Sequence, residues 1–168
     1  LDFNKTISQG DTYDTSYSET MHRIKFFKNF IEDKDGYKLF NRNDGKCKEM
    51  DVQLSFKLVW YKTKFAVDSE VGNGRGVVDF IISKGANDKT LIEFKLASNS
   101  KLEANLLHQL PVYEKANNTN KSIEVILYFN EQEKKKVDRV LKKIDSLNKE
   151  NMIIIDCMNC KLSASNIR

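Results

Sequence analysis

Charged residues interrupt two apolar runs in the stretch GRGVVDFIISKGANDKTLIEFKLAS, residues 74–98. Asp79 lies inside VVDFII, and Glu93 and Lys95 lie inside LIEFKLA. Two carboxylates and a lysine can bind a divalent cation and hold the charge that develops on a phosphate during hydrolysis. Whether the three side chains meet depends on how the two runs pair.

Side chains alternate between the two faces of a β-strand, so the pairing of the runs can be predicted. The even-numbered apolar positions are expected to face the core: Val78, Phe80, Ile82, Ile92, Phe94 and Leu96. The other face carries the three charged residues together with Val77, Ile81 and Leu91. A hairpin centred on Ala86 sets Asp79 directly opposite Glu93, with Cβ atoms ~5 Å apart.

Adjacent carboxylates repel, and burial makes each charge costly unless something compensates it. Mg²⁺ is the simplest compensation, because it takes carboxylate, water and phosphate oxygens as ligands. Lys95 would then orient or help to deprotonate a water, or hold charge on a phosphate. The alternative is a structural ion pair between Lys95 and one acid, the usual role of a lone acid–lysine pair. Two acids and a base on one face favour a functional site.

These residues resemble a known family. Asp79, followed after a short hairpin by Glu93-Phe94-Lys95, is similar to the PD-(D/E)XK signature of nucleases with the restriction-endonuclease-like fold. Gly74-Arg75-Gly76 resembles a small bacterial branch with a GRGxxD…EFK pattern, and Gln109-Leu-Pro-Val-Tyr113 resembles the QxxxY motif of RecB-type nucleases. The similarity in motif order runs from about Glu49 to the strand at 152–156. Val78 departs from the family, because proline is usual at that position.

The resemblance implies a role for each matching residue. Asp79 and Glu93 would bind the metal, with the Phe94 backbone carbonyl as a third ligand, and Lys95 would activate or position the attacking water. Glu70 would be an additional metal ligand or would support the ligands.

Further residues would surround the metal ligands. Gln109 and Tyr113, one helical turn apart, would line the site and contact the substrate strand. The alternative for Tyr113 is an ordinary half-buried tyrosine on an amphipathic helix. Arg75 could reach a phosphate. Glu49 would correspond to the acid that some members place on the first core helix.

The elements that position these residues predict one α/β domain, and the resemblance implies that its core is restriction-endonuclease-like. A central mixed β-sheet is flanked by helices and preceded by one or two N-terminal helices. Residues 1–18 are expected to be a polar lead-in, and 19–168 a single nuclease-like domain. Helices are predicted over 19–33, 47–62, 102–117 and 131–149, with a kink at Pro111. Strands are predicted over 65–71, 77–83, 90–97, 122–129 and 152–156.

Two of these elements have competing interpretations. The segment 47–62 alternates like a strand, yet Met50, Leu54 and Leu58 recur at helical spacing, which favours a helix. The basic residues at 134–143 could face a phosphate backbone, although a solvated helix face is the ordinary interpretation.

Composition limits the function classes. The chain has 168 residues and a net charge of +4. It lacks an apolar run of the ~20 residues that a membrane helix needs, and it lacks a signal-peptide pattern, so a cytoplasmic location without membrane contact is expected. Cys47, Cys157 and Cys160 are expected to be reduced thiols rather than zinc ligands, because only two histidines could complete a site. The chain begins with leucine, which is consistent with processing or with a piece of a larger protein.

These features predict a Mg²⁺-dependent phosphodiesterase in which Mn²⁺ substitutes for Mg²⁺. The resemblance favours DNA over RNA as the substrate, and endonuclease over exonuclease action. A homodimer and a place in a larger protein or complex stay open. The alternatives are a catalytically silent nucleic-acid-binding or interaction module on the same fold, and a hydrolase of small phosphate esters. The intact charged set speaks against a silent module, which would be free to lose these residues.

Overall fold

The computed structural model describes residues 13–40, 47–72, 76–144 and 150–158, with the side chains of 107–113 excepted. Its elements, in chain order, are α2 (Ser16–Asp33), η1 (Gly36–Leu39), α3 (Glu49–Lys57), η2 (Leu58–Trp60), β1 (Ala66–Gly72), β2 (Val77–Lys84), β3 (Asp88–Leu96), α4 (Leu102–Asn117), β4 (Ser122–Tyr128), α5 (Glu131–Lys143) and β5 (Met152–Asp156). Within these ranges, five strands form one sheet in the order β1-β2-β3-β4-β5. The first three strands are antiparallel, and β3, β4 and β5 are parallel. The predicted α/β class with a mixed sheet is confirmed.

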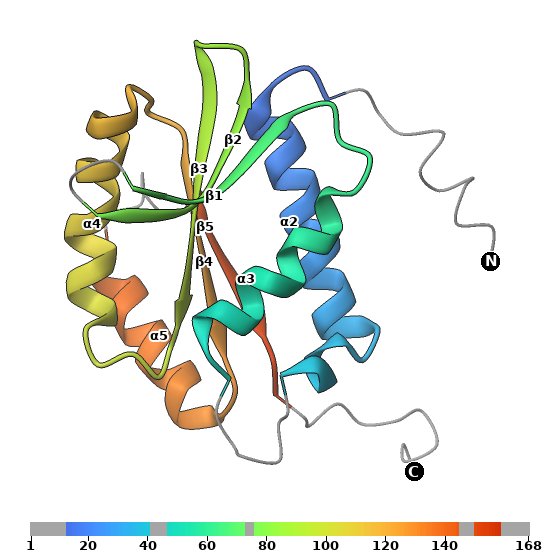
Figure 1. Ribbon diagram of the computed structural model, residues 1–168. Helices are drawn as coiled ribbons and strands as arrows, with labels where there is room; N and C mark the ends of the chain where they lie inside the picture. The colour runs from blue at the N-terminus through green and yellow to red at the C-terminus, as the bar shows by residue number, and fades with distance from the viewer. Residues whose placement is uncertain (1–12, 41–46, 73–75, 145–149, 159–168) are drawn as a thin grey trace.

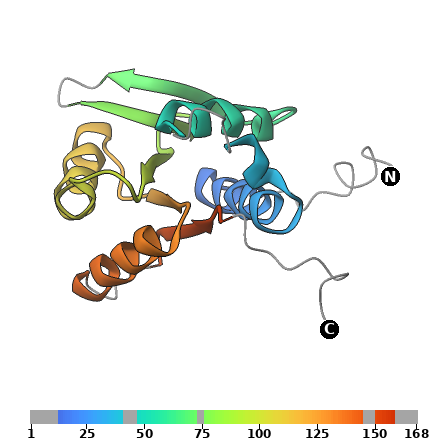
Figure 2. The same cartoon turned by 90° about the horizontal axis from the view of Figure 1, so that it is seen from below.

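Helices cover both faces of the sheet. The helices α2 and α3 lie on one side and α4 and α5 on the other (Figures 1 and 2). On the side of α2 and α3, four phenylalanine rings pack edge to face with centroids 5.0 to 6.4 Å apart: Phe27, Phe56, Phe80 and Phe94. On the other side, Ala97 and Ile126 of the strand layer pack with Leu102 of α4 and Val137 of α5. Each face of the sheet therefore has its own core.

The predicted core face of the central hairpin is confirmed with one exception. Five of the six even-numbered residues belong to the core under α2 and α3: Phe80, Ile82, Ile92, Phe94 and Leu96. Val78 is also buried, but it packs instead with Val71, Ile81 and Leu91 in a separate small cluster. The separation of β2 from β3 described below accounts for this difference, because Val78 lies beyond the last residue pair of the hairpin.

The helix α3 confirms the helical prediction for this segment, but it buries a different set of side chains. The side chains that face the core are Val52, Phe56 and Trp60. The apolar residues whose spacing favoured a helix are exposed, at 67, 65 and 78% for Met50, Leu54 and Leu58. The helix is therefore apolar on two sides, and only one of them is covered by described residues.

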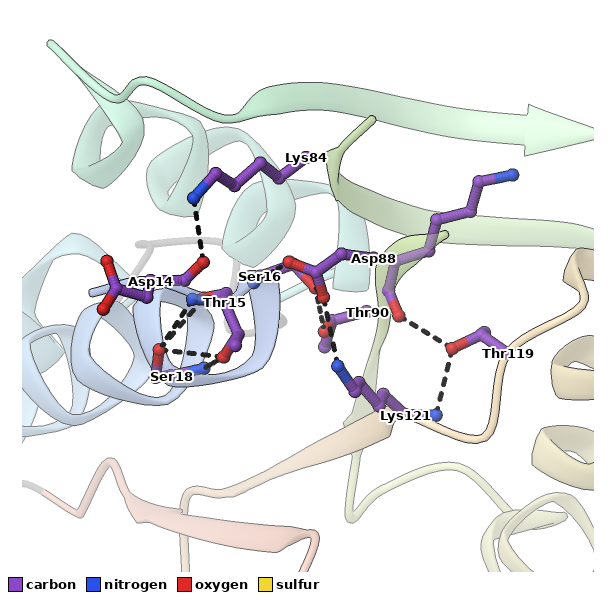
Figure 3. Close-up of polar contacts among 10 residues, drawn as sticks. Asp14, Thr15, Ser16, Ser18, Lys84, Asp88, Thr90, Thr119 and Lys121 are labelled. Atoms are coloured by element: carbon purple, nitrogen blue, oxygen red, sulfur yellow. Dashed lines mark hydrogen bonds and ion pairs between the residues drawn. The ribbon is translucent and has the colours of Figure 1, made fainter. Parts of the chain in front are cut away.

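The helix α2 begins three residues earlier than predicted, at Ser16. Thr15 caps it, because its side chain accepts a hydrogen bond from the Ser18 amide. A helix start also needs acceptors for its first amides. Asp88, at the start of β3, supplies one by accepting from the Ser16 amide at 2.7 Å and from the Ser16 hydroxyl at 2.8 Å (Figure 3).

The same carboxylate joins three elements. Lys121, just before β4, donates to Asp88 Oδ1 at 3.1 Å, and the hydroxyls of Ser16 and Thr90 lie 2.7 Å apart (Figure 3). Partial burial raises the pKa of Asp88, but the hydrogen bonds from Ser16 and the charge of Lys121 outweigh it and hold that pKa below its ordinary value. Asp88 therefore fixes α2 against the two central strands in its ionised form.

Replacing Asp88 by alanine is expected to lower the free energy of unfolding by about 2 kcal/mol at pH 7, because it leaves the Ser16 amide and hydroxyl without this acceptor. Since the native pKa is depressed, this contribution is present above the unfolded pKa of about 4 and is lost as the pH falls further. Urea denaturation at pH 7 and pH 3 measures both effects. Asp68→Ala, on an exposed position of β1, is the control. A difference from wild type that is the same at both pH values would contradict the role of the ionised carboxylate.

No helix in the described ranges is long and apolar enough to cross a membrane.

Candidate active site

The site lies where β2 separates from β3. The two strands pair from Lys84 and Asp88, next to the turn, as far as Phe80 and Ile92. Beyond that point β2 remains paired with β1 as far as Val77 but no longer pairs with β3. The β1–β2 ribbon turns towards the side on which α4 lies (Figures 1 and 2). The pairs from Lys84 and Asp88 to Phe80 and Ile92 confirm the hairpin register predicted around Ala86. The predicted pair of Asp79 and Glu93 would be the next step in that register, but the strands separate before it and the two residues are not paired.

The separation leaves one edge of β3 without a neighbouring strand. The amides of Leu91 and Ala97 donate towards β4, at 2.9 and 2.8 Å. Alternate residues of a strand direct their amides and carbonyls to opposite sides. The backbone amides and carbonyls of Phe94 and Leu96 therefore face the edge that β2 has left. Backbone groups in a buried place need replacement partners.

Two carboxylates replace the missing strand. The Phe94 amide donates to Asp79 Oδ2 at 2.7 Å, and the Leu96 amide donates to Glu49 Oε1 at 3.3 Å. Gln53, one turn after Glu49 on α3, forms a side-chain hydrogen bond with Asp79. The strand separation therefore brings α3, β2 and β3 together through acidic side chains.

A buried row of charges continues from this edge across the sheet. Lys95 Nζ donates to Glu93 Oε2 at 2.9 Å, and Glu93 is the register partner of Glu124 on β4. The three residues are 6, 1 and 0% exposed, respectively. Glu93 Oε1 and both carboxylate oxygens of Glu124 have no hydrogen-bond partner among the described residues. Three buried acceptor oxygens therefore lie beside a single ammonium group.

The helix α4 covers this row. Leu106, in its first half, packs with Ile126, and Glu114, near its end, accepts a hydrogen bond from the Ser122 hydroxyl at the start of β4. The stretch between them, which includes Gln109 and Tyr113, therefore passes over the strand segment that carries the charges. The side chains of these two residues lie outside the described part. The helix is continuous in its backbone assignment from 102 to 117, through Pro111.

The structure places the other predicted residues as follows. Glu70 lies on β1 between two residues that pair with Phe80 and Val78, has a left-handed backbone (φ 56°), and is exposed. The acidic neighbours that raise the pKa of Asp79 include Glu49, whereas Glu70 does not contribute. Arg75 lies outside the described residues, so its role stays a prediction. The structure thus brings Asp79, Glu93 and Lys95 together with Glu49 beside them. The role of the exposed Glu70 stays a prediction.

Sequence reasoning missed two residues of the site. Glu124 lies in SIEVILYF, an apolar run with one acid, and this is the signal that singled out Asp79 and Glu93 in their strands. Gln53 follows Glu49 by four residues and so shares its helix face. Glu124 could have been found by looking for a lone acid in every predicted apolar strand. Gln53 could have been found by looking for polar residues four positions from an acid on every predicted helix.

Burial raises the pKa of three carboxyl groups of the site, those of Asp79, Glu93 and Glu124. It raises the pKa of Glu93, with repulsion from Asp79 adding to the effect, to about 7. It raises the pKa of Glu124 to about 8, although the charge of Lys95 opposes this. It also raises the pKa of Asp79, more than the Phe94 amide and Lys95 lower it.

Lys95 remains the positive charge of the site. Burial alone would lower its pKa, but the Glu93 carboxylate and its hydrogen bond outweigh burial, and the net effect is a raised pKa. The cluster therefore has one ammonium and several carboxyl groups near neutral pH. Lys95 can balance the negative charge of only one of these carboxylates. The others must be neutralised by protons or by a bound cation.

The donor set suits a hard divalent cation. Mg²⁺ and Mn²⁺ prefer oxygen ligands, and Glu93 Oε1 is a buried carboxylate oxygen without a described partner. Asp79, Glu93 and the Phe94 carbonyl, which shares its side of β3 with the Phe94 amide, would hold such an ion. In the described part of the chain, no three Asp, Glu, His or Cys side chains are already grouped around one point. Binding would therefore require Glu93 to exchange its contact with Lys95.

A family model described as a domain of unknown function, DUF8371, matches residues 16–131, more than half of the chain. The chain belongs to this family. The match begins at the first residue of α2 and ends at the first residue of α5, so every site residue named above falls inside it. No curated protein and no solved structure gives a significant match.

The raised acidic pKa values predict that the metal-free protein loses stability as the pH rises. A carboxyl group whose native pKa exceeds its unfolded value of about 4.3 stabilises the fold below that value, and the contribution is lost as the pH rises towards the native pKa. The loss is about 1.4 kcal/mol per pH unit for each such group. Thermal melts in EDTA from pH 5 to pH 8 are expected to show a falling Tm.

Glu124→Gln is expected to flatten this pH dependence and to raise the Tm at pH 8, because the amide cannot ionise. Glu131→Gln, on an exposed position of α5, should leave the curve unchanged. Parallel curves for wild type and Glu124→Gln would contradict a native pKa of Glu124 above neutrality.

Proposed function

We propose that the protein is a metal-dependent nuclease that hydrolyses phosphodiester bonds of nucleic acid, with DNA as the favoured substrate. The observation that carries the proposal is the separation of β2 from β3, which sets Asp79 against the Phe94 amide beside the buried Glu93–Lys95 pair. A structural ion pair accounts for Lys95 and one acid. It does not account for the half-buried Asp79 and the fully buried Glu93 and Glu124 at one point of the sheet, with Lys95 as the one cation that the described residues place there.

Each residue has a role in this proposal. Asp79 and Glu93, with the Phe94 carbonyl, would hold a Mg²⁺ or Mn²⁺ ion, which supplies Lewis-acid stabilisation of the phosphate and lowers the pKa of a bound water. Lys95 keeps its proton near neutral pH, since its pKa is raised. Its ammonium therefore suits the orientation of water or the stabilisation of phosphate charge better than proton abstraction.

The supporting residues hold this geometry. Glu49 accepts from the Leu96 amide and Gln53 bonds Asp79, so α3 fixes both acids at the open edge of β3. Gln109 and Tyr113, on the stretch of α4 that crosses the site, are proposed to contact the substrate strand. The preference for DNA and for endonuclease action rests on the resemblance of the sequence motifs.

Cleavage assays with circular DNA, linear DNA and single-stranded RNA, each with Mg²⁺, Mn²⁺ or EDTA, test the proposal. Asp79→Asn keeps an acceptor for the Phe94 amide, and Lys95→Met keeps most of the side-chain volume, so both variants are expected to fold. Cleavage should require the cation and should fall about 100-fold or more in both variants. Lys25→Met, on an exposed position of α2, should cleave like wild type.

The circular substrate separates endonuclease from exonuclease action. Equal cleavage by wild type and both site variants would assign the activity to another site or to a contaminant. If no protein cleaves in any metal, although all remain folded, the nuclease proposal is contradicted for this chain.

The affinity of the site for the cation is also expected to rise with pH. Glu93 has a pKa of about 7, and a protonated carboxyl group is a poor metal ligand. Below that value, the apparent Mn²⁺ affinity should increase up to about tenfold per pH unit, and it should level off above the pKa. Calorimetric titrations at pH 6, 7 and 8 measure this, and an affinity that is independent of pH would contradict the assignment of Glu93 as a ligand.

A second candidate is a non-catalytic interaction module, which one observation favours. Met50, Leu54 and Leu58 form an exposed apolar stripe along α3 and η2, and Tyr61 beyond it is 73% exposed. Contiguous exposed apolar surface commonly marks an interaction site. Nucleic-acid binding without cleavage by wild type and by both site variants would favour this candidate.

A further inference from the structure

Glu124 is the most deeply buried acid of the site, and the proposed function gives it no role. It is 0% exposed, and neither of its carboxylate oxygens has a hydrogen-bond partner among the described residues. An ionised carboxylate in such a place is costly unless a positive charge compensates it. Packing alone does not account for a carboxyl group at this position of a central strand.

Among the described residues, Lys95 is the positive charge within reach of Glu124. Glu93 is the register partner of Glu124, and Lys95 lies two residues further along the same face of β3. A diagonal neighbour on a sheet lies ~7–8 Å away, a distance that a long side chain can span. Among the charges near Glu124, that of Lys95 has the largest effect on the Glu124 pKa.

Lys95 is engaged with the acid that a cation would need. Its Nζ lies 2.9 Å from Glu93 Oε2, and both side chains are almost completely buried. A cation bound to Glu93 would repel the ammonium and compete with it for the carboxylate oxygens. An ammonium released into buried surroundings without an acceptor is itself costly. Cation binding therefore needs a second carboxylate to receive Lys95.

We propose that Glu124 is a positioning residue that accepts the Lys95 ammonium when Glu93 turns to a divalent cation. The exchange is between ion pairs and involves no covalent step. It keeps the lysine paired with one carboxylate both before and after the cation binds, and it holds the ammonium close to the ligands. This inference rests on the proposed function, because it assumes a cation at Asp79 and Glu93.

A double-mutant cycle tests the exchange without relying on cleavage. Mn²⁺ binding is measured by calorimetry on the full chain for wild type, Glu124→Gln, Lys95→Met and the double variant. Glu124→Gln is expected to weaken Mn²⁺ binding about tenfold when Lys95 is present. In the Lys95→Met background it should have no further effect, because no ammonium has to be accommodated. Glu114→Gln, a change in a nearby acid that bonds Ser122, should leave Mn²⁺ binding unchanged.

Glu124→Asp provides a second variant that retains the charge. It should bind Mn²⁺ more tightly than Glu124→Gln, and thermal melts in EDTA establish that each variant is folded. If Glu124→Gln does not fold, the comparison of Glu124→Asp with wild type in both Lys95 backgrounds carries the test, with a weaker effect of the same sign expected.

Each other outcome overturns the proposal in a distinct way. Equal Mn²⁺ affinity of wild type and the Glu124 variants removes any role for Glu124. Equal weakening with and without Lys95 makes Glu124 a direct ligand of the cation rather than the partner of the lysine. A wild-type protein that binds no Mn²⁺ contradicts the proposed function itself, and the exchange is overturned with it.

Discussion

The hydrogen bond from the Phe94 amide to Asp79 Oδ2 is the contact on which the arrangement of the site depends. When two strands of a sheet separate, the amides along the opened edge must find other acceptors or lose stability. Here a carboxylate from the departing strand supplies one acceptor, and Glu49 from α3 supplies the next. Because both acceptors are carboxylates, the hydrogen bonds that replace the strand pairing also gather negative charge where the strands separate.

The two faces of the sheet differ in what they carry: one carries an aromatic core, and the other carries the charged residues of the candidate site. On the side of α2 and α3, four phenylalanine rings form a well-packed core, which includes Phe80 and Phe94 from the two separating strands. That packing holds β2 and β3 together on one side while their neighbouring residues Asp79, Glu93 and Lys95 face the other. The odd-numbered residues can therefore be polar and costly, since the even-numbered ones secure the strands.

Much of this fold could be predicted from the sequence. Alternation of apolar and polar residues located the strands, and a turn centred on Ala86 gave the register that the structure confirms. The long-range parts were not accessible in the same way. The strand separation depends on how β1, β2 and α3 pack, and the closeness of Glu124 to Glu93 depends on the parallel pairing of β3 with β4. The contact of Glu49 with the Leu96 amide was likewise beyond the sequence, because the resemblance does not show which acid reaches the opened edge of β3. The stripe of Met50, Leu54 and Leu58 correctly indicated a helix but not which side of it is buried.

Asp79 accepts the Phe94 amide and is also a proposed metal ligand, and this has a consequence for how relatives are compared. Under the proposed function, a relative without activity would still need acceptors for the Phe94 and Leu96 amides, and it would be expected to keep Asp79 and Glu49 for folding alone. The persistence of these two acids across a lineage is thus poor proof of activity. Within the described residues, Glu93 and Glu124 accept a hydrogen bond from neither the Phe94 amide nor the Leu96 amide. Burial of the ionised carboxylate is costlier for Glu124, because neither of its oxygens has a described partner. Under the proposed function, the presence of Glu93 and Glu124, rather than that of Asp79, would distinguish active relatives from inactive ones.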